Sequence, residues 1–127
     1  AWISLGHLYF DSGQHQNAIV AYEKGIALVG GNADVLTDLG VMYRRAGQPE
    51  KAIDYFNRAI AADPLHKYSK MNKGIVLFYD LGKEEEALQT WEALAATNPE
   101  LTFNNGMSIR DGIDQLRKEM QQQTPQQ

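Results

Sequence analysis

The sequence contains no cysteine among its 127 residues. Disulfide bonds, thiol catalysis and cysteine-based zinc sites are therefore excluded, although a chain without cysteine tolerates either redox compartment. The sequence also lacks any apolar run that approaches the ~18 residues a membrane span needs, and it shows no signal-peptide pattern. We therefore expect no direct membrane insertion of this chain.

An excess of basic residues is likewise missing. Lys and Arg number 12 against 16 Asp and Glu, which gives a net charge of −4 at pH 7. Because a nucleic-acid-binding protein carries a basic stripe, we expect no nucleic-acid partner. Hydrophobic residues make up 43% of the chain, which is enough for a packed core, and the length suits one domain.

The chain begins with Ala1 and Trp2 rather than with Met. Since Ala1 already lies in a helical pattern, we expect an excised domain or a processed form. The sequence leaves the cellular compartment of the protein open. We expect it to be cytoplasmic or, if a membrane anchor lies upstream, periplasmic.

A repeat of about 34 residues runs through most of the chain. The first copy carries Leu5-Gly6, Tyr9, Gly13, Ala18 and Tyr22, and the second carries Leu39-Gly40, Tyr43, Gly47, Ala52 and Phe56. The third follows at 35 residues, as Phe78, Gly82, Ala87 and Trp91. We expect the extra residue near Lys67, in the turn between copies, so that Ile75 rather than Gly74 takes the position of the glycine in the other copies.

Each copy is expected to form two helices. In the first copy, apolar residues recur with helical spacing at Trp2, Leu5, Leu8 and Tyr9. A glycine at 13, 47 or 82 ends the first helix as a left-handed C-cap. Pro49 fits the first turn of a second helix, whereas Asp63-Pro64 and Asn98-Pro99 end the second helices.

The spacing Trp2-x-x-Leu5-Gly6-x-x-Tyr9, followed by Ala18-x-x-x-Tyr22, resembles the tetratricopeptide repeat family. Three units carry the resemblance, at residues 1–32, 33–66 and 68–101. It implies an all-α, right-handed solenoid of three helix pairs plus one C-terminal helix. Small glycine and alanine residues let the paired helices approach to ~8–10 Å, and neighbouring pairs stack to bury their apolar faces.

A final helix is predicted over residues 109–121, which closes a single domain over 1–121. Ser108 and Asp111 form a start similar to a capping box. One apolar stripe contains Ile109, Ile113, Leu116 and Met120. We expect this helix to cap the third copy, the alternative being docking in the groove or on another protomer. Residues 122–127 lack apolar side chains and are expected to be disordered.

The sequence shows no convincing catalytic or metal-binding motif. His7 and Asp11 are spaced for one metal ion, but no third ligand accompanies them. Residues 84–86 are all Glu, which is typical of a helix N-terminus. Neither a nucleophile elbow nor a phosphate-binding glycine loop is present. We therefore expect no enzyme activity, no cofactor and no metal.

In the family that the chain resembles, the first helices of the units line a concave surface that binds peptides or protein segments. The resemblance places these residues on that surface: Ile3, His7, Phe10, Asp11, Asp34, Thr37, Val41, Arg44, Arg45, Ser69, Asn72, Lys73, Val76 and Tyr79. Aromatic and Arg residues are enriched at binding hot spots. We therefore interpret the groove as a site for a segment with apolar side chains and an acidic group near Arg44. The alternative is that Arg44 pairs with Asp11 or Asp80 and that the aromatic residues pack within the chain.

One specialisation of the family does not match. Members that clamp the C-terminal carboxylate of heat-shock chaperones use Lys and Asn in the first unit, Asn in the second, and Lys and Arg in the third. The matching positions here are Ile3, His7, Asp38, Ser69 and Lys73. Since only Lys73 is basic, a clamp of that kind is not expected.

Two other functions stay open besides a protein-interaction scaffold. The first is self-assembly, because the first unit leaves apolar surface at the end of the stack. The second is a role like that of bacterial repeat proteins of cytochrome c maturation and envelope assembly. The run 73–82, the Ala-x-x-x-Trp helix and the Asn-Gly break before a short helix are similar to those proteins.

Overall fold

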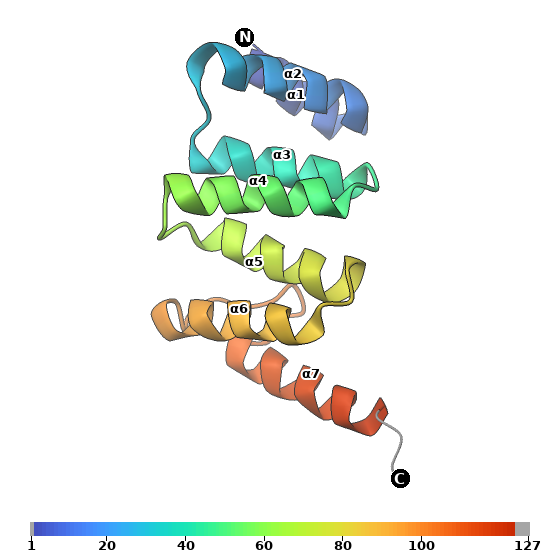
Figure 1. Cartoon of the computed structure of the whole chain (residues 1–127), viewed down its shortest axis with the longest axis vertical. Coiled ribbons are helices and arrows are strands. Elements are labelled where there is room, and N and C mark those ends of the chain that lie inside the picture. The colour runs from blue at the N-terminus through green and yellow to red at the C-terminus, as the bar shows by residue number, and fades with distance from the viewer. Residues whose placement is uncertain (1, 124–127) are drawn as a thin grey trace.

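The computed structural model describes residues 2–123, which form a stack of helices (Figure 1). Three pairs follow one another: α1 (Trp2–Asp11) with α2 (His15–Val29), α3 (Ala33–Arg45) with α4 (Pro49–Ala62), and α5 (Lys67–Ile75) with α6 (Glu84–Thr97). A π-helical turn, η1 (Val76–Asp80), continues α5, and α7 (Ile109–Gln123) closes the stack. The expected helical-repeat solenoid of three helix pairs plus one C-terminal helix is confirmed.

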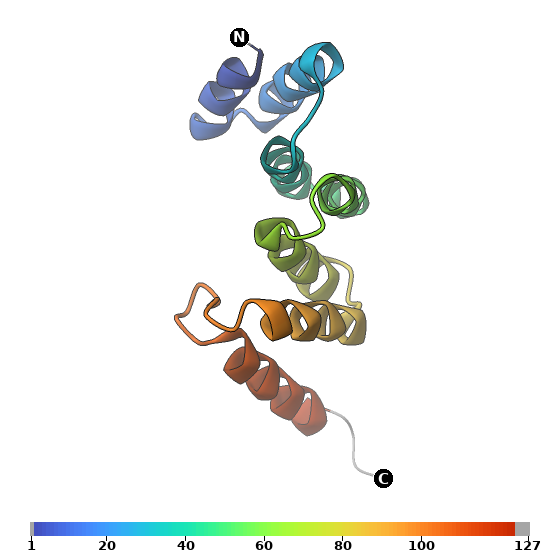
Figure 2. The same cartoon turned by 90° about the vertical axis from the view of Figure 1, so that its left-hand side faces the viewer.

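The first helices of the pairs form one side of the stack. In Figure 2, α1, α3 and α5 lie along one side, and α2 and α4 lie along the other. The segment 98–108, between α6 and α7, projects on the side of α1, α3 and α5. That side is curved inward, because α3 and α5 lie deeper than α1 and the projecting segment.

The helix boundaries follow the local signals of the sequence. Gly13, Gly47 and Gly82 end the first helices with φ of 77°, 80° and 67°, a conformation that glycine adopts without steric cost. Pro49 lies in the first turn of α4. Asn32 caps α3, since its side chain accepts a hydrogen bond from the Val35 N–H at 2.9 Å.

The paired helices touch where glycine leaves room for an aromatic ring. A Cβ atom on Gly6 would lie 2.4 Å from Cδ2 of Tyr22, and one on Gly40 would lie 2.5 Å from Cε1 of Phe56. The equivalent contact in the third pair belongs to Gly74, whose added Cβ would lie 2.1 Å from Nε1 of Trp91. The expectation that Ile75 replaces this glycine is therefore wrong, and the repeat keeps its spacing of 34 residues up to residue 74.

The extra residue of the third unit lies inside a helix. In η1 the Leu81 N–H donates to the Val76 carbonyl oxygen, five residues earlier, at 3.0 Å. A π-helical turn accommodates one residue more than an α-helical turn in the same span. The insertion thus follows Gly74 and is not near Lys67.

The core of the described residues contains three apolar clusters, of which the smallest consists of Ala33, Leu36 and Ala59. One of the two larger clusters joins the first and second pairs around Tyr22, Leu39 and Phe56, and the other surrounds Trp91 in the third pair. Ile53 and Leu81 pack against both larger clusters. Each pair therefore buries its apolar surface against its neighbour, as a solenoid requires.

Helix α7 packs on the third pair. Ile109 and Ile113 are 1% and 4% exposed and belong to the cluster around Trp91, against which Leu116 and Met120 also pack. The Ser108 hydroxyl accepts a hydrogen bond from the Asp111 N–H at 3.1 Å at the helix start. The helix runs to Gln123, two residues beyond the predicted end, and the rest of the expected tail lies outside the described residues.

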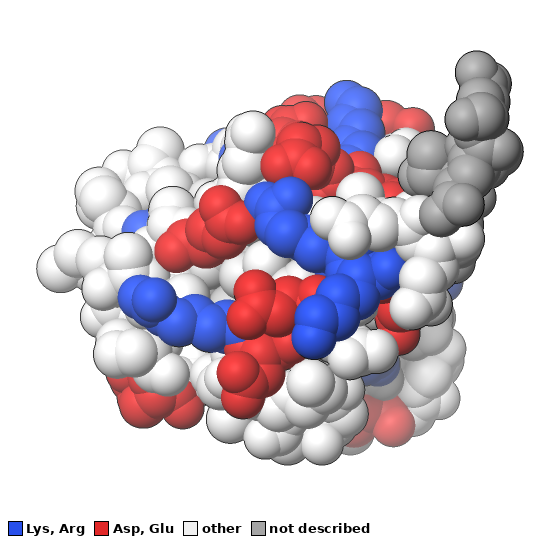
Figure 3. Space-filling model, turned by 90° about the horizontal axis from the view of Figure 1, so that it is seen from below, with Lys and Arg blue, Asp and Glu red and all other residues white. Residues whose placement is uncertain are grey.

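The two ends of the stack differ in polarity. Seen from the C-terminal end, Lys and Arg alternate with Asp and Glu on the surface (Figure 3). Arg117 of α7 pairs there with Glu85 at 3.3 Å and Glu92 at 2.5 Å. At the other end, Leu8 is 64% exposed, whereas Met42 at the same position of the second unit is 1% exposed. The C-terminal end of the described chain therefore has a charged outer surface, whereas Leu8 leaves apolar surface exposed at the other end.

Candidate functional site

Helices α1, α3 and α5 lie along the inward-curving side of the stack (Figure 2), which we call the concave side. Most of the residues assigned to it are exposed or half-buried in the structure: Ile3, His7, Phe10, Asp11, Asp34, Val41, Arg44, Arg45, Asn72, Lys73 and Tyr79. Their side chains are at least partly accessible to solvent. This accessibility is a requirement for contact with a partner.

Three of the assigned residues are buried. Thr37 is 5% exposed, and its hydroxyl donates to the Ala33 carbonyl oxygen of its own helix at 2.7 Å. The Ser69 side chain is fully buried and donates to the His66 carbonyl oxygen at 3.0 Å. Val76 is 0% exposed and belongs to the core. We therefore remove Thr37, Ser69 and Val76 from the candidate surface.

The extra residue in η1 explains why the surface positions expected in the third unit are shifted by one residue. Counting 34 residues from the second unit moves the surface positions from Ser69, Asn72 and Val76 to Tyr68, Met71 and Ile75. Tyr68 is 57% exposed, and Met71 and Ile75 line a pocket. The equal spacing of Gly6, Gly40 and Gly74 was the sequence signal that would have identified them.

Arg44, which the sequence suggested as an anchor for an acidic group, already has a partner. Its Nε donates to Oδ2 of Asp80 at 2.6 Å, and its Nη2 donates to Oδ1 at 3.3 Å. This two-point ion pair joins α3 to η1 across 36 residues of sequence. The guanidinium charge is thus balanced within the chain, as the alternative interpretation predicted.

The two aromatic residues of the same row differ in their surroundings. The guanidinium carbon of Arg45 lies 4.6 Å from the centre of the Phe10 ring, over its face. Tyr79 touches Phe78, with the ring centres 4.8 Å apart, yet it remains 62% exposed. Tyr79 therefore offers more open aromatic surface than Phe10 does.

Histidine and carboxylate groups gather near α1 and the start of α3. His7 Nδ1 lies 2.6 Å from the Tyr22 hydroxyl, and His66 Nε2 lies 2.7 Å from Oδ1 of Asp34. Burial raises the pKa of Asp38 and the charge of Asp34 adds to the rise, whereas His7 and His66 partly offset it. Burial also raises the pKa of Tyr22 above its ordinary value, with a smaller contribution from the charge of Asp38.

We expect Asp38→Asn to raise the thermal midpoint at pH 7. Burial favours the neutral form of Asp38 in the folded state, so the ionised carboxylate lowers stability above the raised pKa. This gain in thermal midpoint disappears near pH 3, because the Asp38 carboxyl is then mostly protonated in both the folded and the unfolded state. Thermal melts at the two pH values test this, with Asp54→Asn on an exposed position of α4 as the control. A lower midpoint for Asp38→Asn at pH 7 would contradict the prediction.

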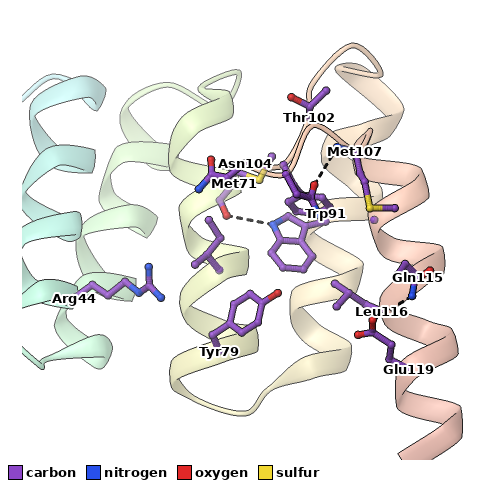
Figure 4. A pocket seen from close by; sticks show the side chains of 14 residues that line it. Arg44, Met71, Tyr79, Trp91, Thr102, Asn104, Met107, Gln115, Leu116 and Glu119 are labelled. Atoms are coloured by element: carbon purple, nitrogen blue, oxygen red, sulfur yellow. Dashed lines mark hydrogen bonds between the residues drawn. The ribbon is translucent and has the colours of Figure 1, made fainter.

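A pocket of about 530 Å³ opens at the C-terminal part of the concave side. Figure 4 shows Arg44 and Tyr79 on one side of it and Gln115, Leu116 and Glu119 of α7 on the other. Its remaining lining residues are Met71, Ile75, Trp91, Thr102, Phe103, Asn104, Asn105, Met107 and Gly112. The pocket therefore joins the surface of the third unit to the segment 98–108 and to α7, both of which lie outside the repeats.

The wall made by segment 98–108 is held in place by packing. The Phe103 ring lies edge-on to Trp91, with the ring centres 4.9 Å apart. A Cβ atom on Gly112 would lie 2.2 Å from Cε2 of Phe103, so glycine allows the ring to pack on α7. The Phe103 N–H donates to the Met107 carbonyl oxygen at 2.9 Å. The segment is thereby a fixed part of the pocket.

The described residues show no metal-binding or membrane-spanning feature. No group of three or more His, Asp or Glu side chains lies together within residues 2–123 as metal ligands do. In that same part of the chain, no helix combines the length and apolar character needed to cross a bilayer.

The fold resembles solved structures of peptide-binding domains. The first tetratricopeptide domain of Spaghetti (RPAP3), bound to an HSP90 peptide, superposes with a TM-score of 0.79 at 22% identity, covering 94% of this chain and 90% of that one. The second such domain of human RPAP3, in complex with an HSP70 peptide, gives a TM-score of 0.70 at 28% identity, with 76% and 80% covered. The first likeness shows the fold alone.

Sequence comparison connects the chain to a much longer protein. It is similar to anaphase-promoting complex subunit 3 of Schizosaccharomyces pombe, with 28% identity over 120 residues. That region covers 93% of this chain but 17% of the relative. The chain therefore matches a small part of the relative's length.

The family profile agrees with the geometry of the fold. Residues 1–64, half of the chain, match the tetratricopeptide repeat family. The helix pairs, the glycine–aromatic contacts between them and the 34-residue spacing extend the same architecture into the third unit. This chain is a member of the tetratricopeptide repeat family, whose domains are typically protein-interaction scaffolds without catalytic activity.

Proposed function

We propose that the concave side of α1, α3 and α5 binds an extended or helical segment of a partner protein. The carrying observation is the uncovered apolar surface of Tyr79, which is 62% exposed beside a pocket that Met71 and Ile75 also line. Exposed apolar surface on a concave face is typical of interaction sites, and aromatic residues are enriched at binding hot spots. The domain acts as a scaffold and performs no chemistry itself.

The peptide complexes of similar structures support this proposal. The HSP70 peptide bound to the RPAP3 domain is SGPTIEEVD, which is acidic. This chain does not offer the same chemistry, because the corrected spacing moves the two clamp positions of the third unit to Tyr68 and Asn72. With Ile3, His7 and Asp38 at the other positions, none of the five carries Lys or Arg. A partner of different charge is therefore the better fit.

A charge placed in the centre of the surface tests the proposal. Val41 lies on α3 and is half-buried, so Val41→Lys puts an ammonium group on the floor of the groove. We expect at least a tenfold lower recovery of partner proteins from a lysate of the source organism, which corresponds to about 1.4 kcal/mol. Quantitative mass spectrometry of the captured proteins provides the measurement.

The matched control is Val20→Lys. Val20 lies on α2 and is 50% exposed, so it receives the same substitution outside the concave side. Circular dichroism checks that both variants fold, and sedimentation ensures that all domains are monomeric at the concentration used. Equal capture by the Val41→Lys variant and the wild type would overturn the proposal.

A further inference from the structure

We propose that the pocket between η1 and α7 is a specificity pocket for a bulky apolar side chain of the partner, with an adjacent Lys or Arg of the partner pairing with Glu119. This inference rests on the proposed function and assigns it a ligand chemistry. It places a recognition element outside the repeats, because one wall consists of α7 and segment 98–108.

The size and lining of the pocket suit an apolar anchor. Its volume of about 530 Å³ lies within the roughly 300–1,000 Å³ that is usual for ligand pockets. Met71, Ile75 and Leu116 line it together with the side chains of Phe103 and Met107. Methionine side chains are flexible and adapt to side chains of different shape, so we expect the pocket to accept several large apolar residues.

The π-helical turn shapes one wall. The extra residue in η1 shifts the residues after Gly74 by one position relative to the other units. Tyr79 then lines the pocket, and Asp80 reaches Arg44 at 2.6 Å. The third unit thus has the exposed ring of Tyr79 at the position where the second unit has Arg44. The charge of Arg44 is neutralised by Asp80.

The charges at the pocket determine the sign of the partner. Arg44 is paired with Asp80 and does not require an acidic group from outside. Glu119 accepts a hydrogen bond from the Gln115 amide at 3.2 Å, but it has no ion pair with a cation among the described residues. Its carboxylate is therefore available to a Lys or Arg that lies next to the apolar anchor.

The rest of the concave side agrees with a basic partner. Asp11 and Asp34 are exposed there, with His66 Nε2 2.7 Å from Asp34. The half-buried Asp38 carboxylate makes no hydrogen bond among the described residues. The cations Arg45 and Lys73 lie on the same side, Arg45 over the Phe10 ring. A cation brought close to the three carboxylates gains favourable electrostatic energy. An acidic peptide would instead face the like charges of Asp11, Asp34 and Asp38, which disfavours binding.

The test uses a phage-displayed library of random 12-residue peptides as the probe. We expect the wild-type domain to enrich peptides that contain a large apolar residue next to Lys or Arg. An enriched peptide is then synthesised, and its affinity is measured by fluorescence anisotropy. In a second peptide, the basic residue next to the apolar anchor is replaced with Glu. This peptide tests whether reversing both charges, in the peptide and at Glu119, retains the pairing.

Two variants of α7 examine the pocket without touching the groove of the repeats. Gln115→Trp fills the pocket from an exposed position and should weaken the peptide at least tenfold. Glu119→Lys should weaken it about three- to tenfold, since an exposed pair contributes little, and should improve binding of the Glu-containing peptide. The matched controls are Gln121→Trp and Asp114→Lys, at exposed positions of the same helix that do not line the pocket.

The outcomes separate this inference from the proposed function. Two results together support the pocket: both pocket variants lose affinity for the selected peptide, and the Glu119→Lys variant binds the Glu-containing peptide better than the wild type does. Peptides that bind both pocket variants like the wild type, but are lost by Val41→Lys, overturn the pocket and retain the groove. Failure of the wild-type domain to enrich any peptide overturns both.

Discussion

Gly74→Ala is expected to destabilise the domain by about 1–3 kcal/mol, the usual cost of overpacking a core. The added Cβ would lie 2.1 Å from Nε1 and 2.4 Å from Cε2 of Trp91. Trp91 has no room to move away, because it is fully buried and its Nε1–H donates to the Met71 carbonyl oxygen at 3.2 Å. Urea denaturation of the wild type and the variant measures the difference in unfolding free energy.

Whether Gly74→Ala lowers or raises the stability of the domain distinguishes two possible positions for the extra residue of the third unit. With the insertion near Lys67, Gly74 would lie away from the helix contact, and alanine would stabilise α5 by roughly 0.5–1 kcal/mol. With the insertion in η1, Gly74→Ala destabilises. Gly40→Ala is the positive control, since its Cβ would lie 2.5 Å from Phe56. A more stable Gly74→Ala variant would refute the η1 insertion.

The double substitution Ile109→Ala with Ile113→Ala is expected to detach α7. Each truncation of a fully buried isoleucine costs about 2–5 kcal/mol, and these two are 1% and 4% exposed against the cluster around Trp91. Because solenoid units are stabilised mainly by their nearest neighbours, protection from hydrogen exchange should fall first in α6 and α7. Protection in α1–α4 should change less.

The matched control substitutes the exposed neighbours Arg110 and Asp114 with alanine. Hydrogen exchange followed by mass spectrometry resolves the individual helices. Since α7 forms one wall of the pocket, the isoleucine variant should also lose the peptides selected by the wild type. Unchanged protection of α6 would show that α7 is not a structural cap.

The sequence by itself determined the architecture of this protein. The 34-residue period, the turn glycines and the capping residues act through local backbone conformation and helical spacing, which depend little on distant contacts. Most of the surface residues that the family resemblance assigned to α1 and α3 are exposed or half-buried in the structure. Thr37 is the exception there, because its hydroxyl bonds to its own helix.

Only the tertiary structure decided the details of the third unit. A period of 35 residues does not tell whether the extra residue enters a turn or a helix, and the contact of Gly74 with Trp91 places it in η1. The pairing of Arg44 with Asp80 joins positions 36 residues apart. The pocket needs Phe103 packed between Trp91 and Gly112. No repeat pattern encodes these contacts, because they arise from packing between segments that lie far apart in the chain.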